Sequence, residues 1–189
     1  MEVRHFVTGA KSHIALAGPA NKQGRIAADH ICGRRSAYTG ALGTSVLKLF
    51  DLTAASTGLN EKQARAAGVA YDKVVTYSAS HASYYPGARN MTVKTLFDPA
   101  SGRILGAQIV GFDGVDKRMD VLAAAIRAGL TAEQLTELDL AYAPPYGSAK
   151  DPVNMAGYVI ENVRAGLVEQ HHWDAVAELP ADGSVILLD

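Results

Sequence analysis

The chain has 189 residues, of which 48% are hydrophobic and 20% are charged, and its formal net charge is −1. This length suits one domain of moderate size, or one domain with parts of its neighbours, and the composition excludes a disordered polypeptide. Both signs of charge are interspersed and no apolar run approaches ~18 residues, so we expect neither nucleic acid nor a membrane as a partner.

The chain is expected to begin with an irregular segment and a helix. Residues 1–17 show no sustained hydrophobic period. A helix is predicted over residues 18–33, with Gly18 as its cap and Pro19 at the first helical position, where the missing N–H costs nothing. Gly33 suits the exit of this helix, because glycine tolerates a left-handed backbone.

Strands dominate the next part of the chain. Residues 44–57 favour one or two strands, and a short helix comes after them, because Asn60 and Gln63 have the spacing of a capping box. Three further strands are then predicted, over residues 72–79, 91–98 and 103–111. The turn "DPASGR" joins the last two, which indicates an antiparallel hairpin.

Helices dominate residues 116–166. The first of them, residues 116–128, has apolar side chains at helical spacing, namely Met119, Leu122, Ala123 and Ile126. A second helix is expected to start at Thr131, with Gln134 at capping-box spacing. Asp151 and Pro152 suit the cap and first position of a third helix, which Gly166 would close. Its predicted core face is Ala156, Val159, Ile160 and Val163.

Strands grouped before helices favour an α+β fold, with an antiparallel sheet covered by helices on one face. Residues 183–189, "GSVILLD", suit a buried strand with no partner strand in the sequence. We therefore expect both ends of the chain to continue into further polypeptide.

The sequence lacks the motifs of a complete enzyme. It contains no G-x-G-x-x-G after a strand, no G-x-x-x-x-G-K-[ST] phosphate loop and no G-x-S-x-G elbow. Its six histidines do not have metal-ligand spacing, so no metal site is expected. The single cysteine, Cys32, excludes an internal disulfide and fits a reducing, cytoplasmic setting. We expect it to be a small buried hydrophobic residue, the usual role of a free cysteine.

Six stretches stand out in order between about residue 12 and residue 165: "LAGPANKQGRIAADHICG", "GTSVLKLFDLTAASTGLNEKQA", "SHASYYPGA", "TLFDPASGRILGAQIVG", "GVDKRMDVLAAAI" and "DLAYAPPYGSAKDPVNMAGYV". Together they resemble the coenzyme A-disulfide reductase branch of the FAD-dependent pyridine nucleotide-disulfide oxidoreductases. The tail "HHWDAVAELPADGSVILLD" resembles the start of a rhodanese-like domain.

This resemblance implies three regions. Residues 1–35 would be the C-terminal end of an FAD-binding domain, residues 36–166 the dimerisation domain, and residues 167–189 a linker with a truncated rhodanese-like start. The redox cysteine and both nucleotide fingerprints would lie upstream, and Cys32 does not align with that cysteine. The complete enzyme would use FAD and NAD(P)H, whereas we expect neither to be bound to this chain alone.

The resemblance also implies site residues. Tyr84 and Tyr142 match tyrosines that reach across a homodimer to the partner's flavin and cysteine. Pro19 and Ala20 would lie beside the flavin, and the start of their helix would direct its positive end at the flavin ring. Coenzyme A disulfide, or a related thiol or persulfide, would be the substrate, and Asn21 and Lys150 would contact its coenzyme A part.

Alternatives remain open for the site and for the function. Tyr142 and Tyr146 could be half-buried rim residues, and the prolines of their loop could serve only to prevent a helix. Asn21 and Lys150 could be solvated side chains. The enzyme could instead be an NADH oxidase or peroxidase of the same superfamily. The chain could also be a scaffold or binding protein without catalysis.

Overall fold

The centre of the molecule is a five-stranded antiparallel sheet, in the computed structural model that describes residues 2–185. The strand order is β3-β4-β7-β6-β5. The strands are β3 (Ser45–Leu49), β4 (Leu52–Gly58), β5 (Asp72–Ala79), β6 (Asn90–Phe97) and β7 (Ile104–Gly111). Residues 44–57 thus form a hairpin of two strands, and the predicted hairpin of β6 and β7 is confirmed.

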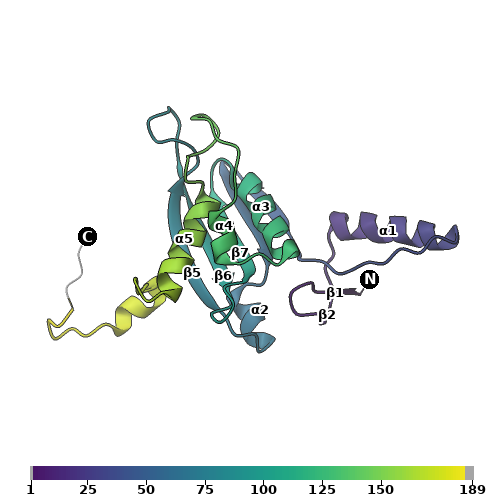
Figure 1. The fold of residues 1–189 in the computed structure, drawn as a ribbon, viewed down its shortest axis with the longest axis horizontal. Helices are drawn as coiled ribbons and strands as arrows, with labels where there is room; N and C mark the ends of the chain where they lie inside the picture. Colours follow the sequence, from purple (N-terminus) through teal and green to yellow (C-terminus); the bar gives the residue numbers. More distant parts are fainter. Residues whose placement is uncertain (1, 186–189) are drawn as a thin grey trace.

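Three helices cover one face of this sheet, as Figure 1 shows. They are α3 (Val115–Ala128), α4 (Ala132–Thr136) and α5 (Pro152–Arg164). A shorter helix, α2 (Glu61–Ala66), comes after β4. The predicted α+β class, with an antiparallel sheet and helices on one side, is confirmed.

Local signals set the ends of these helices. The Asn60 side chain accepts from the backbone N–H of Gln63, while the Gln63 side chain accepts from that of Asn60, so the capping box of α2 is confirmed. Asp151 caps α5 through the N–H of Val153. Gly129 ends α3 with a φ of 74°, a left-handed conformation that glycine adopts without a Cβ clash.

The core lies between the sheet and the helices. On α3 the expected stripe is confirmed for Met119, Leu122 and Ile126, whereas Ala125 is buried more deeply than Ala123. The predicted face of α5 is also confirmed, with Ala156 and Ile160 buried and Val159 and Val163 packed against the cluster. Val74, Val93 and Ile109 contribute from the sheet.

The face of the sheet opposite these helices carries a row of side chains that crosses all five strands. Cross-strand pairing joins them in order as Leu47, Ala54, Val110, Thr92 and Tyr77. Residues paired directly across strands lie on the same face. Leu47, Val110 and Tyr77 are exposed, so this row gives the uncovered face of the sheet an apolar surface.

The N-terminal segment differs from expectation in two ways. Residues 1–17 are not irregular throughout, because β1 (Val3–Arg4) and β2 (Lys11–Ser12) form an antiparallel pair. Helix α1 (Ala17–Ile31) starts before Gly18, with Leu16 at its N-cap, so Pro19 is the third helical residue. Leu16 makes no side-chain cap hydrogen bond, so no capping residue in the sequence marks the true start of the helix.

Helix α1 projects away from the sheet (Figure 1) and buries none of its side chains within residues 2–185. Cys32 comes directly after it and is exposed, so the prediction that Cys32 is buried is wrong. Cys32 lies between Ile31 and Gly33, but no packed element of the described chain covers this end of the helix.

After α5 the chain leaves the core. A 3-10 helix, η1 (Trp173–Glu178), lies beside the edge strand β5, where the Gln170 side chain exchanges hydrogen bonds with the backbone of Val75. The strand expected in residues 183–189 falls mostly on 186–189, which lie outside the described residues. The three regions assigned from the sequence, and the rhodanese-like start, stay predictions.

Candidate functional site

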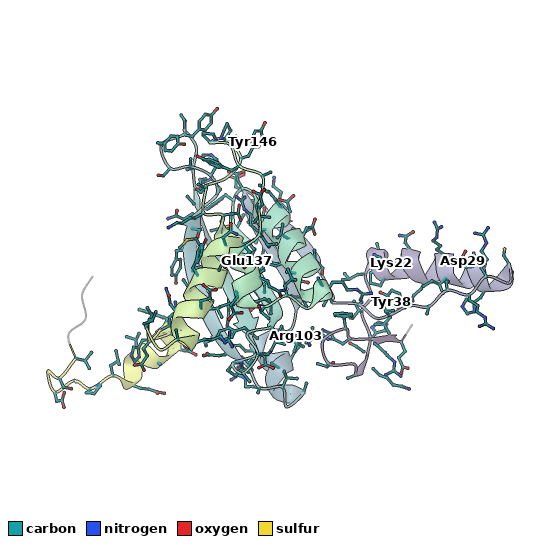
Figure 2. All side chains as sticks on the ribbon, viewed as in Figure 1. Lys22, Asp29, Tyr38, Arg103, Glu137 and Tyr146 are labelled. Carbon is teal, nitrogen blue, oxygen red and sulfur yellow. The ribbon has the colours of Figure 1, made fainter. Side chains whose placement is uncertain are left out.

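Two loops meet at one end of the sheet and bring two tyrosines into contact. The first loop, residues 80–89, joins β5 to β6; the second, residues 139–150, leads into α5. We refer to them as the tyrosine loops. The phenol oxygens of Tyr84 and Tyr142 lie 3.0 Å apart, which is hydrogen-bond distance for two hydroxyl groups. The loops lie together at the top of the molecule, where Tyr146 is labelled in Figure 2.

The two rings are accessible. Tyr84 is 75% exposed and Tyr142 is 48% exposed. The hydrogen bond shared with Tyr142, in which either hydroxyl can be the donor, raises the pKa of the Tyr84 phenol above its ordinary value. The Tyr84 phenol therefore keeps its proton at neutral pH, and the pair presents hydroxyl groups that can donate to an incoming sulfur or oxygen.

Backbone contacts hold the two loops together. The N–H of Ala82 donates to the carbonyl of Gly147 at 2.8 Å, and so joins the first loop to the second. Within the second loop, the N–H of Tyr146 donates to the carbonyl of Ala143 at 2.8 Å and closes a turn. Pro144 and Pro145 lie inside this turn, where their fixed φ lowers the entropy cost of ordering it.

A buried ion pair lies beneath the loops. Arg118 of α3 and Asp151, the cap of α5, are 1% and 3% exposed, and the Arg118 Nη2 to Asp151 Oδ2 distance is 2.9 Å. The same guanidinium donates to the carbonyls of Ser80 and Tyr146, which belong to the two loops.

Arg118 was not assigned to the site from the sequence. A usable signal was present, because position 118 is one helical turn before Leu122 and so lies on the buried stripe of α3. A charged residue on such a stripe needs a partner, and Asp151 is that partner.

The other tyrosines of the loops have different surroundings. The ring of Tyr85 packs edge-on against His81, with centroids 5.7 Å apart. Tyr146 is 72% exposed, more open than the half-buried rim position considered from the sequence.

The remaining predicted site residues do not join this pair within the chain. Lys150 is exposed beside Asp151, at the end of the second loop. Pro19, Ala20 and Asn21 lie on α1, which projects away from the sheet. The Asn21 side chain donates to the carbonyl of Ala17, one turn earlier. A site that uses both sets of residues must therefore be completed by other parts of a protein.

Two further classes of site are not found in the described chain. Within residues 2–185, no three histidine, cysteine, aspartate or glutamate side chains gather as a metal-ion site. No helix in the same residues has the length and apolarity needed to cross a membrane.

Residues 44–152 match the dimerisation domain of the pyridine nucleotide-disulphide oxidoreductases. This match covers more than half of the chain, and the chain belongs to that family.

Among its relatives are a coenzyme A disulfide reductase of Staphylococcus haemolyticus and an NAD(P)H coenzyme A polysulfide/persulfide reductase of Pyrococcus horikoshii. The first is 40% identical over 148 residues, which are 78% of this chain and 33% of that protein. The second is 36% identical over 160 residues, 85% of this chain and 36% of that protein.

A solved crystal structure has the same fold. The reduced CoADR-RHD of Bacillus anthracis superposes with a TM-score of 0.91 at 51% identity, covering 94% of this chain and 32% of that one. The chain thus spans about a third of the length of the proteins it matches.

Proposed function

We propose that the chain is the dimerisation and substrate-site module of an FAD-dependent NAD(P)H:coenzyme A-disulfide reductase, or of a reductase acting on a related persulfide or polysulfide. The observation that carries this proposal is the Tyr84–Tyr142 hydroxyl pair at the accessible end of the domain. The kinship with reductases of coenzyme A disulfide and of coenzyme A polysulfide/persulfide supports the substrate class.

The chemistry needs a proton donor at sulfur. Reduction of a disulfide takes two electrons and two protons and yields two thiols, so each sulfur that leaves as a thiolate must be stabilised or protonated. Tyr142, held by Tyr84, can donate its hydroxyl proton toward such a sulfur while Tyr84 keeps the phenol oriented. A positioned general acid contributes roughly 10²–10⁴-fold to the rate of such a step.

The residues of α1 fit a flavin. No side chain caps this helix and its first turn carries no acidic residue, so the backbone N–H groups of Ala17 and Gly18 and the positive end of the helix dipole are available to an electron-rich ring edge. Pro19 and Ala20 would lie against that ring. When bound, FAD would pass reducing equivalents from NAD(P)H to the disulfide.

A homodimer completes the proposed site. The tyrosine loops and α1 lie on separate parts of one chain, so the tyrosines of one subunit would serve the flavin and cysteine of its partner. Asn21 would contact the pantetheine arm of coenzyme A and Lys150 its phosphates, because an amide suits polar groups and an ammonium suits anions. A reducing cytoplasm suits an enzyme whose products are thiols.

The test uses the full-length enzyme that contains this chain. Purified protein is expected to be yellow, to run as a dimer in light scattering, and to oxidise NADH or NADPH when coenzyme A disulfide is added. A stoichiometric flavin complex that oxidises NAD(P)H only with oxygen or peroxide would identify an NADH oxidase or peroxidase instead. A full-length protein with neither flavin nor turnover would favour the scaffold alternative.

A further inference from the structure

We propose that Arg118 is a positioning residue for the reduction: it sets the separation and orientation of Tyr84 and Tyr142 by holding both tyrosine loops from below. This inference rests on the proposed function, because it concerns the same tyrosine pair. Arg118 itself touches neither phenol in the structure and has no access to substrate, since it is buried.

Arg118 connects the two loops. Through Nη2, it donates to the carbonyl of Ser80 at 2.9 Å and to that of Tyr146 at 3.5 Å. Ser80 begins the loop that carries Tyr84, and Tyr146 belongs to the loop that carries Tyr142. One guanidinium therefore ties the two loops to each other and to α3.

The guanidinium of Arg118 is itself held rigidly. Its Nε and Nη2 both face Asp151 Oδ2, at 3.1 and 2.9 Å, and Nη1 donates to the carbonyl of Gly114 at 3.2 Å. The planar fork of arginine thus has its donors occupied from three directions, which fixes its position. Lysine has a single nitrogen and cannot serve all of these acceptors together.

Little else orients the two phenols. Tyr84 is 75% exposed and Tyr142 is 48% exposed, so side-chain packing restrains them weakly. The 3.0 Å contact between their hydroxyls then depends on where the loop backbones stand. A displacement of about 1 Å at a reacting group can cost on the order of 10²-fold in rate.

A matched control exists at the other end of the domain. Arg164 of α5 also fastens a loop: it pairs with Glu133 and donates to the carbonyls of Pro99 and Ala100, in the turn between β6 and β7. Like Arg118 it makes an ion pair and donates to loop carbonyls, although its side chain is 24% exposed, and it fastens a different turn from the tyrosine loops. Replacing it tests the effect of weakening the domain without disturbing the tyrosines.

The experiment is a double-mutant cycle in the full-length dimeric flavoenzyme, with coenzyme A disulfide as substrate. Arg118→Lys is combined with Tyr84→Phe/Tyr142→Phe, and flavin content, dimer mass and thermal unfolding are recorded for each variant. If Arg118 acts through the tyrosines, Arg118→Lys lowers kcat by roughly 10- to 100-fold with KM little changed. Added to the tyrosine variant, Arg118→Lys lowers kcat by less than about twofold more, because the effects of substitutions that act through one network are not additive.

Other outcomes separate the inference from the proposed function. Costs that multiply in the combined variant, or Arg164→Lys lowering kcat as much as Arg118→Lys, would reduce Arg118 to a general stabilising residue while leaving the tyrosine chemistry intact. Wild-type turnover of the tyrosine variant alone would overturn the proposed function, and the inference with it. If Arg118→Lys does not give a dimeric flavoprotein, the same cycle is run with Asp151→Asn. This variant keeps a side-chain oxygen that can cap α5, but it weakens the interaction of residue 151 with Arg118. Additive losses of kcat in that cycle would overturn the inference equally.

Discussion

Tyr84 and Tyr142 are 58 residues apart in the chain, and their hydroxyl oxygens meet at 3.0 Å. The backbone hydrogen bond from Ala82 to Gly147 joins the two loops, and the buried Arg118 donates to a carbonyl of each. A paired, protonated phenol at an accessible end of a domain is suited to donate to a leaving thiolate.

Replacement of Tyr142 by phenylalanine in the full-length enzyme should slow disulfide reduction at least several-fold while flavin, dimer and fold are kept. Only one hydroxyl is lost, so the packing is unchanged. The double variant with Tyr84→Phe should be slower still, because Tyr84 shares the same hydrogen bond. Steady-state rates with coenzyme A disulfide measure both effects. Unchanged turnover of the double variant at full flavin occupancy would leave the two tyrosines as surface packing residues.

Replacement of Asp151 by alanine should destabilise the domain severely. It leaves the buried Arg118 charge without its partner, which typically costs about 3–5 kcal/mol, and it removes the cap of α5, which typically costs about 1 kcal/mol. Asp151→Asn keeps a capping oxygen and should cost less. Urea unfolding of the 189-residue chain compares the two. Equal loss in both variants would mean that the cap adds little to the stability and that the ion pair carries most of it.

Glu61 should make the stability of the domain depend on acid pH. Burial alone raises the pKa of the Glu61 carboxyl, but hydrogen bonds from Lys94 and Lys73 outweigh it and lower the pKa to about 2. A folded pKa below the ordinary 4.5 means that the carboxylate stabilises the fold above pH 4.5 and loses this contribution as the pH falls toward 2.

The comparison of Glu61→Gln with the parent chain measures this effect. The parent should be the more stable by roughly 1.5–3 kcal/mol at neutral pH, the range for hydrogen bonds to charged groups. The difference should shrink between pH 4.5 and pH 2 in denaturant titrations. Glu137→Gln, at an exposed position, is the control. A difference that stays constant down to pH 2 would show that the lysines do not hold the Glu61 carboxylate in its charged form.

The 189-residue chain by itself should be colourless and should not oxidise NAD(P)H. Its sequence has no dinucleotide-binding fingerprint, and α1 offers a helix end without the rest of a flavin pocket. An absorption spectrum of the purified chain after addition of FAD tests this. A stoichiometric yellow complex that survives gel filtration would contradict the expectation.

The sequence by itself determined the elements of this fold and much of their order. Alternation of apolar residues, the "DPASGR" turn, the capping box at Asn60 and the cap at Asp151 act over a few residues, so the backbone follows them directly. Similarity of whole motifs to one family identified Tyr84 and Tyr142 as candidate site residues. The start of α1 escaped local signals because an uncapped helix end leaves no mark in the sequence.

The tertiary structure decided which of these residues meet. The pairing of Tyr84 with Tyr142 and the burial of Arg118 against Asp151 both depend on elements far apart in the chain. No local pattern records such contacts, because they arise when α3, α5 and two loops pack at one end of a sheet. The position of Arg118 on the apolar stripe of α3 indicated that this residue needs a partner, but only the folded structure shows that the partner is Asp151.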